Sequence, residues 1–179
     1  MNTIISHTPT PEYYEGWARI FGNQDTNFPK PFDPTDHTII FDLDGTLADN
    51  RHRDNLIEGD NKRWDKYFEM CFKDEPYKDV IQMCNLFYEI GFHVVILSGR
   101  SDRVKDKTVA WLEQNKVSYS ELHMRKDSDH RPDTIVKKQI MDRHFNNVKI
   151  FAIFDDRDCV VKMWRDNGYR CYQVNYGNF

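Results

Sequence analysis

The sequence lacks a long apolar run, since no stretch of its 179 residues approaches the roughly 18 apolar residues that a membrane-spanning helix needs. The N-terminal segment, MNTIISHTPTPEYY, also lacks the basic and long apolar regions of a secretory signal peptide. Hydrophobic residues make up 39% of the chain and charged residues 30%, a balance typical of soluble globular proteins. We therefore expect no membrane partner and a cytoplasmic location.

Cysteine is also scarce, and the chain carries no net positive charge. The four cysteines, Cys71, Cys84, Cys159 and Cys171, form no CxxC pair and have no neighbouring histidine at zinc-ligand spacing, which favours reduced thiols over a zinc site. The net charge of -4 and the pI near 6.0 argue against a protein that grips long nucleic acid over a wide basic surface. These totals leave room for a local basic groove.

The chain divides into an N-terminal arm and one domain. Residues 1–36 combine an aromatic stretch, Tyr13 to Phe21, with Pro29, Pro31 and Pro34, and these prolines oppose a long helix. We interpret this segment as an arm that packs against its own domain, and stacking on a nucleic-acid base is the less favoured alternative. Residues 37–179 have the length of one ordinary domain, with no internal repeat.

From Thr38 onward, short apolar runs alternate with stretches of helical composition, which predicts an α/β fold with a parallel sheet. The predicted strands are Thr38–Asp42, His93–Ser98, Glu121–Met124, Lys149–Asp155 and Tyr169–Val174. The predicted helices are Lys78–Ile90, Val104–Asn115, Pro132–Arg143 and Asp158–Asn167, and Gly91 and Gly168 stand where helices commonly end. Residues 49–76 break the alternation and carry aromatic residues at partly helical spacing, so we predict a small helical insertion there.

Two carboxylates and a Gly-Thr turn follow the first predicted strand, in the run Asp42-Leu43-Asp44-Gly45-Thr46. Ligands of open α/β sheets bind beyond the carboxyl ends of the strands, so this run stands where chemistry is expected. Taken alone, such a run is as often a strand that ends in a polar turn. Chemical groups at other strand ends therefore carry the functional interpretation.

The second strand ends in Ser98-Gly99-Arg100, which offers a hydroxyl, a close backbone approach and a guanidinium to a phosphate. A later strand ends in the acidic run Asp155-Asp156-Arg157-Asp158, whose carboxylates repel one another without a cation. Mg²⁺ suits such a site because it prefers carboxylate and water oxygens together with substrate phosphate.

Lys137 lies one helical turn after Asp133, where it would reach the same site or form an ordinary surface ion pair. Together, the four motifs resemble those of the haloacid dehalogenase (HAD) superfamily over residues 38–179. That resemblance implies a Rossmannoid sheet of five core strands in the order 5-4-1-2-3, with helices on both faces and a small cap after the first strand. It also implies catalysis by Asp42 as nucleophile and Asp44 as general acid and base.

The resemblance further assigns the remaining site residues. Mg²⁺ would be held by Asp42, Asp44 (through its carbonyl), Asp155 and Asp156. The phosphoryl group and substrate would be bound by Thr46, Arg53, Ser98, Gly99, Arg100, Asp133 and Lys137. Arg53 is included because it stands at the spacing of an arginine that follows the first motif in part of the superfamily.

Several segments, among them SGR and RPDTIVK, are similar to the 3′-phosphatase domains of bacteriophage polynucleotide kinase/phosphatases. The P-loop motif GxxxxGK[ST] of a kinase half is absent from this sequence. The resemblance implies a phage-related origin, a host-cytoplasmic location if the chain is phage-encoded, and removal of 3′-phosphates from DNA or RNA ends. A nucleotidase of the same mechanism is the alternative, a pure binding module is disfavoured, and the oligomeric state stays open.

Overall fold

The computed structural model describes residues 33–177. The predicted arm at residues 1–36 lies outside the described residues except for its last four, where Pro34–Asp36 form a 3₁₀ turn, η1. The Asp33 side chain accepts a hydrogen bond from the Thr35 backbone N–H and so begins this turn.

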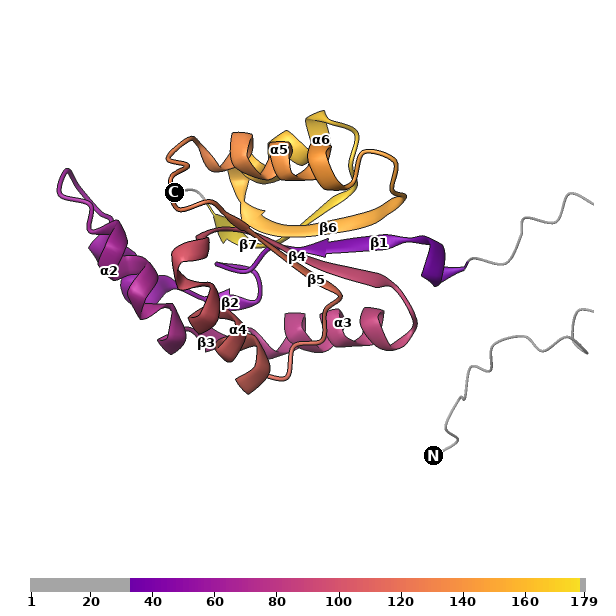
Figure 1. The fold of residues 1–179 in the computed structure, drawn as a ribbon, viewed down its shortest axis with the longest axis horizontal. Helices are drawn as coiled ribbons and strands as arrows, with labels where there is room; N and C mark the ends of the chain where they lie inside the picture. The colour runs from indigo at the N-terminus through magenta and orange to yellow at the C-terminus, as the bar shows by residue number, and fades with distance from the viewer. Residues whose placement is uncertain (1–32, 178–179) are drawn as a thin grey trace, which may run out of the picture. The chain divides into compact units, whose positions relative to one another are not determined.

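Five parallel strands form the central sheet (Figure 1): β1 (Thr38–Phe41), β4 (His93–Ser101), β5 (Glu121–Arg125), β6 (Ile150–Arg157) and β7 (Cys171–Gly177). Their spatial order is β5-β4-β1-β6-β7. Counted as core strands along the chain and read from β7, this order is 5-4-1-2-3, as the HAD resemblance implies. The labels differ because two short strands, β2 and β3, lie between β1 and β4 in the sequence.

Helices cover both faces of this sheet, which confirms the predicted α/β fold. Figure 1 shows α3 (Lys78–Glu89) and α4 (Lys105–Gln114) on one face, and α5 (Asp133–His144) and α6 (Asp158–Asp166) on the other. Gly91 and Gly168 follow α3 and α6 with φ of +100° and +82°, a left-handed conformation that glycine adopts without strain.

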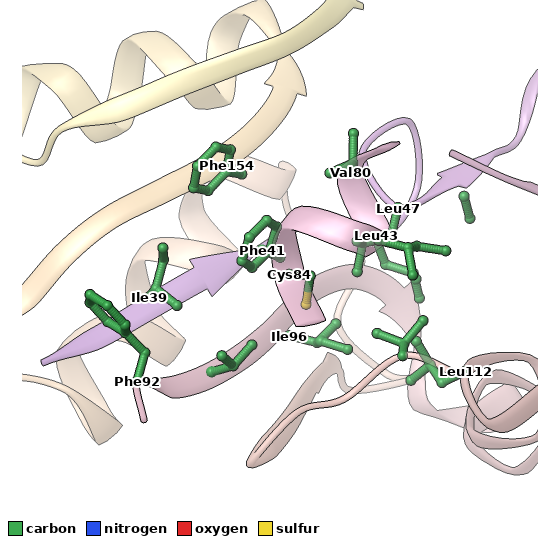
Figure 2. Packing of buried hydrophobic residues seen from close by; sticks show 14 of the residues in the cluster. Ile39, Phe41, Leu43, Leu47, Val80, Cys84, Phe92, Ile96, Leu112 and Phe154 are labelled. Atoms are coloured by element: carbon green, nitrogen blue, oxygen red, sulfur yellow. The ribbon is translucent and has the colours of Figure 1, made fainter. Parts of the chain in front are cut away.

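Alternation along β1 divides the core between the two faces. Ile39 and Phe41 point toward α3 and α4, whereas Ile40 points toward α5 and α6, because successive side chains of a strand face opposite ways. Figure 2 shows the first of these layers, in which Phe41 stacks on Phe154 of β6 with ring centroids 4.6 Å apart. Both faces of the sheet are thus buried, which suits the continuous apolar runs of its central strands.

The insertion after β1 is confirmed as small and partly helical. It contains η2 (Arg51–Leu56), α2 (Trp64–Glu69) and η3 (Met70–Lys73). At its base, β2 (Ala48–Asp49) pairs antiparallel with β3 (Glu75–Pro76), a ribbon that the sequence did not predict because each strand has only two residues.

Candidate active site

The register of the sheet brings three chemically active strand ends together. Phe41 pairs with Ile96 of β4 and with Phe154 of β6, and the Asp42 backbone N–H donates a 2.9 Å hydrogen bond to the Phe154 carbonyl. Asp42 therefore lies beside Asp155, and the segment that contains Ser98 flanks β1 on the other side. The predicted groups of β1, β4 and β6 meet at the carboxyl edge of the sheet, where ligands of such folds bind.

Three buried carboxylates form the centre of the site. Asp42, Asp155 and Asp156 are at most 5% exposed, and each offers an oxygen within 4.8 Å of the others. Burial, followed by the charge of Asp155, raises the pKa of Asp156 to about 7. A cluster of oxygen donors this crowded and this deeply buried fits a hard divalent cation.

Lys137 is the cation that faces these carboxylates. Its side chain is buried, and its Nζ lies 2.8 Å from Asp155 Oδ2 and 2.9 Å from Asp42 Oδ1. Although burial opposes it, the charges of Asp155 and Asp42 raise the pKa of the ammonium group, which stays protonated. Lys137 is therefore not an ordinary surface partner of Asp133, whose Oδ2 lies farther away at 3.7 Å.

One ammonium does not balance three carboxylates. Asp42 Oδ1, despite its closeness to Lys137, accepts no hydrogen bond from the described residues. A buried oxygen without such a bond is costly, and a cation shared with Asp155 and Asp156 would satisfy it. Thr46, predicted to bind substrate, instead lies fully buried with its hydroxyl 3.4 Å from Asp156 Oδ1.

Asp44 has a different electrostatic environment, because two buried arginines hold its carboxylate. Arg53 Nη2 donates a 2.5 Å hydrogen bond to Asp44 Oδ1, and Arg100 donates to both carboxylate oxygens. Burial acts to raise the pKa of Asp44, but Arg100 and Arg53 outweigh it and hold the pKa well below the usual range of an aspartate. The side chain of Asp44 thus points to the arginines, and only its backbone carbonyl is left for the predicted metal contact.

Asp74 is an important residue that the sequence analysis missed. Its fully buried carboxylate accepts hydrogen bonds from Arg53 Nε at 2.8 Å and Nη2 at 2.6 Å, and from Arg100 Nη2 at 2.9 Å. The Arg53 guanidinium also lies 4.1 Å from the centroid of the Tyr67 ring. Asp74 precedes β3 in the insertion, and no motif or periodicity of the sequence marks it.

Glycines allow carboxylates to approach the backbone at two points of the site. A Cβ atom on Gly99 would lie 2.1 Å from Asp133 Oδ1, and one on Gly45 would lie 2.1 Å from Asp156 Oδ2. Ser98, fully buried, accepts a 3.1 Å hydrogen bond from the Arg100 backbone N–H and so shapes the irregular last residues of β4, where the pairing with β5 shifts between Ser98 and Ser101. The absence of side chains at Gly45 and Gly99 thus leaves the space that the carboxylates of Asp156 and Asp133 occupy.

An open cleft of about 970 Å³ leads to these groups. Asp42, Asp44 and Arg100 line its base, and Trp64 and Phe68 of α2 line the side formed by the insertion. Among the residues suggested for the predicted substrate site, Arg53, Ser98 and Lys137 lie behind this surface, in the buried layer.

Arg125 connects two distant segments beside the site, a role that only the structure reveals. Its guanidinium donates to the Gly99 carbonyl at 2.7 Å, to the Arg131 carbonyl at 2.7 Å and to Asp133 Oδ1 at 3.0 Å. The side chain thereby ties the loop that follows β5 to the irregular end of β4. These hydrogen bonds of Arg125 depend on packing between distant segments, which no local sequence pattern reveals.

The sheet order, the carboxylate loop after β1 and the small insertion that follows it are those of HAD-type phosphatases. Solved structures agree at the level of the fold. The class C acid phosphatase from Bacillus anthracis, with tungstate bound, aligns with a TM-score of 0.54 at 16% identity, over 75% of this chain and 62% of that chain.

Within this class, residues 36–179 match the family model of the polynucleotide kinase PNKP phosphatase domain, and the chain belongs to that family. It is therefore a phosphatase of HAD type. A structure of the Pnkp1/Rnl/Hen1 complex contains a chain that aligns with a TM-score of 0.69 at 28% identity, over 88% of this chain.

A relative from Autographa californica nuclear polyhedrosis virus, described as a bifunctional polynucleotide kinase/RNA ligase, is 31% identical over 133 residues. The alignment covers 72% of this chain but only 18% of the viral protein, and the chain spans about half (52%) of its match in the Pnkp1 complex. These relatives are thus much longer proteins. In the part of the chain that the structure describes, no helix is long and apolar enough to cross a membrane.

Proposed function

We propose that the chain is a Mg²⁺-dependent phosphomonoesterase that removes 3′-phosphates from the ends of DNA or RNA through an aspartyl-phosphate on Asp42. The observation that carries this proposal is the position of Asp42, which follows β1 at the base of the cleft beside Asp155, Asp156 and Lys137. When bound by the three carboxylates, Mg²⁺ would neutralise charge on the phosphoryl oxygens.

In the first half of the reaction, an Asp42 oxygen bonds to phosphorus and the bond from phosphorus to the ester oxygen breaks. A carboxylate needs no base to act as a nucleophile. Asp44 gives its proton to the departing sugar oxygen. In the second half, water attacks the phosphorus and passes a proton to Asp44, and the Asp42 carboxylate is released together with inorganic phosphate.

The two arginines would serve both Asp44 and the substrate. Arg53 and Arg100 contact Asp44 and Asp74 in the structure, and a phosphoryl group that enters the cleft competes for the same guanidinium donors. Asp44 then loses contacts that favour its ionised form, as a proton donor requires. Because Arg53 is buried with Arg100, we assign it to the phosphoryl group rather than to a nucleic-acid surface.

Family membership favours a polynucleotide end as the substrate, since the matched domain and the viral relative both carry polynucleotide kinase names. The cleft volume of about 970 Å³ and the exposed Trp64 at the side of the cleft are compatible with a nucleotide that continues into a longer strand. A mononucleotide remains the alternative, which the net charge of -4 favours.

The test combines a variant with a substrate panel. Asp42→Asn should reduce phosphate release to background with every substrate, because the amide is nearly isosteric but is not a nucleophile. Asp166→Asn, at an exposed position near the end of α6, is the matched control and should keep full activity. The wild-type chain should turn over 3′-phosphorylated oligonucleotides faster than 3′- or 5′-mononucleotides.

Acid-quenched wild-type enzyme should carry a hydroxylamine-labile phosphoryl group that Asp42→Asn lacks. Activity of a clean Asp42→Asn preparation above background would exclude the covalent route. Faster turnover of mononucleotides would replace the polynucleotide assignment with the nucleotidase.

A further inference from the structure

A second hollow continues from the active-site cleft. It has a volume of about 1070 Å³ and lies between the end of β5 and the length of α5. The two hollows share a common wall, formed by Asp102, Lys126 and the segment from Ser128 to Arg131. A ligand that leaves the cleft over this wall enters the second hollow, which we call the β5–α5 groove.

Positive charge predominates in this groove. Its lining includes four Lys and Arg side chains, Lys105, Lys126, Arg131 and Arg143, against two carboxylates, Asp102 and Asp129. Both carboxylates already have partners, because Lys126 pairs with Asp102 at 2.8 Å and Arg131 with Asp129 at 2.5 Å.

Lys105 and Arg143 remain as exposed cations, and neither forms an ion pair within residues 33–177. Isolated surface cations are common and usually only solvated. These two differ because they line one hollow that opens into the active-site cleft and whose acidic groups are already neutralised. The lining of the groove therefore carries two more Lys and Arg side chains than carboxylates, and this excess of positive charge faces whatever occupies the groove.

The groove also has the length and the flat surfaces that suit a nucleic-acid strand. From Asp133, beside the active site, to Arg143, α5 extends about 15 Å, room for roughly four stacked nucleotides at about 3.4 Å each. His123 and His144 line the same groove with ring centroids 4.6 Å apart, and such rings stack with bases of any sequence.

We propose that the β5–α5 groove binds the phosphates and bases on the 5′ side of the reacting 3′-phosphate, in a single-stranded DNA or RNA end. Lys105 and Arg143 contact the strand phosphates, and His123 and His144 contact its bases. This inference rests on the proposed 3′-phosphatase activity and names the feature that would favour a polynucleotide over a mononucleotide. It also reconciles an acidic chain with a nucleic-acid substrate, since the basic surface is local.

The experiment compares the double variant Lys105→Ala/Arg143→Ala with the control Lys149→Ala/Arg170→Ala. The control removes one lysine and one arginine as well, both exposed and both at the amino edge of the sheet, next to the starts of β6 and β7. Substrates are 3′-phosphorylated single strands of one, two, four and eight nucleotides, and nitrophenyl phosphate, over a range of salt concentrations.

In the wild type and the control, kcat/KM should rise with strand length. In the groove variant, kcat/KM for the octanucleotide should fall by about 10-fold or more. The slope of log kcat/KM against log salt concentration should become shallower by about 1.4, because each of the two lost phosphate contacts contributes roughly 0.7. Its turnover of nitrophenyl phosphate and of the mononucleotide should stay within twofold of wild type, which also shows that the variant is folded.

Three results would overturn the inference. The first is an unchanged octanucleotide kcat/KM in the groove variant, and the second is an equal loss in the control variant. The third is a wild-type kcat/KM that does not depend on strand length; release of 3′-phosphate from all lengths would then leave the proposed function intact. If the wild type hydrolyses nitrophenyl phosphate but no 3′-phosphorylated substrate, the proposed function itself fails, and the groove assignment fails with it.

Discussion

Replacement of Asp74 by asparagine tests the buried charge network most directly. Two arginines, Arg53 and Arg100, and two carboxylates, Asp44 and Asp74, meet behind the cleft, so the formal charges of these four groups cancel. His52 Nε2 lies 2.8 Å from Asp74 Oδ1 at the edge of this network. Asp74→Asn leaves one uncompensated positive charge in a fully buried position. In the carboxylate of Asp74, both oxygens accept hydrogen bonds from guanidinium N–H groups. Asparagine replaces one of these oxygens by an NH2 group, which cannot accept such a bond.

The magnitude follows from the burial of the network. Loss of one partner from a buried ion pair costs about 3–5 kcal/mol. Since Asp44 still contacts both arginines, we expect the lower end, a decrease of about 3 kcal/mol in the free energy of unfolding. At a denaturant slope of about 2 kcal/mol per molar, the urea midpoint would fall by about 1.5 M.

The control for this prediction is Asp65→Asn. Asp65 also pairs with an arginine, Arg103, at 2.7 Å, but its side chain is 87% exposed. Exposed pairs contribute about 1 kcal/mol or less, so this variant should unfold close to the wild type. Urea unfolding followed by tryptophan fluorescence measures both. If Asp74→Asn lowers the free energy of unfolding by less than about 1 kcal/mol, or if both variants lower it equally, the stability of the network does not depend on Asp74.

Three further predictions address the catalytic groups. Gly45→Ala and its control Gly168→Ala both place a side chain at positive φ (+84° and +82°), which costs about 1–2 kcal/mol of stability each. Only the added Cβ at Gly45 clashes with Asp156, so only Gly45→Ala should abolish activity when the variants are assayed at matched protein concentrations. Mg²⁺ at 100 times its dissociation constant should stabilise the wild type by about 2.7 kcal/mol in thermal unfolding, and markedly less in Asp156→Asn; an equal shift would place the metal elsewhere. Asp44→Asn should slow an alkyl phosphate far more than nitrophenyl phosphate, because nitrophenolate leaves without a proton, and equal losses in parallel assays would contradict the acid role.

The sequence was sufficient for the fold class and for the strand ends that carry chemistry. Runs such as Thr38–Phe41 are short, apolar and followed by polar turns, and the structure has a strand there. The groups at Asp42, Ser98 and Asp155 could be predicted to converge because parallel strands end at one edge of a sheet. Local patterns of this kind are encoded by neighbouring residues, and they need no knowledge of packing.

Pairing between side chains from distant segments required the tertiary structure. Asp74 lies 21 residues from Arg53 and 26 from Arg100, and Arg125 reaches the Gly99 carbonyl over 26 residues. Sequence alone predicted Lys137 at the site and left a surface ion pair with Asp133 as the alternative, and the burial of Lys137 against Asp155 argues against that surface pair. Likewise, the net charge of -4 gives no sign of a groove whose cations come from α4, the loop after β5, and α5.

The sequence by itself thus determined which strands form the central sheet and which reactive groups end them, because these depend on local hydrophobic periodicity and turn chemistry. The tertiary structure decided which charges are buried, which of them compensate one another and which face the open grooves. Those properties arise from desolvation and from distances of a few ångströms, and both exist only after the insertion, α5 and the sheet edge have packed together.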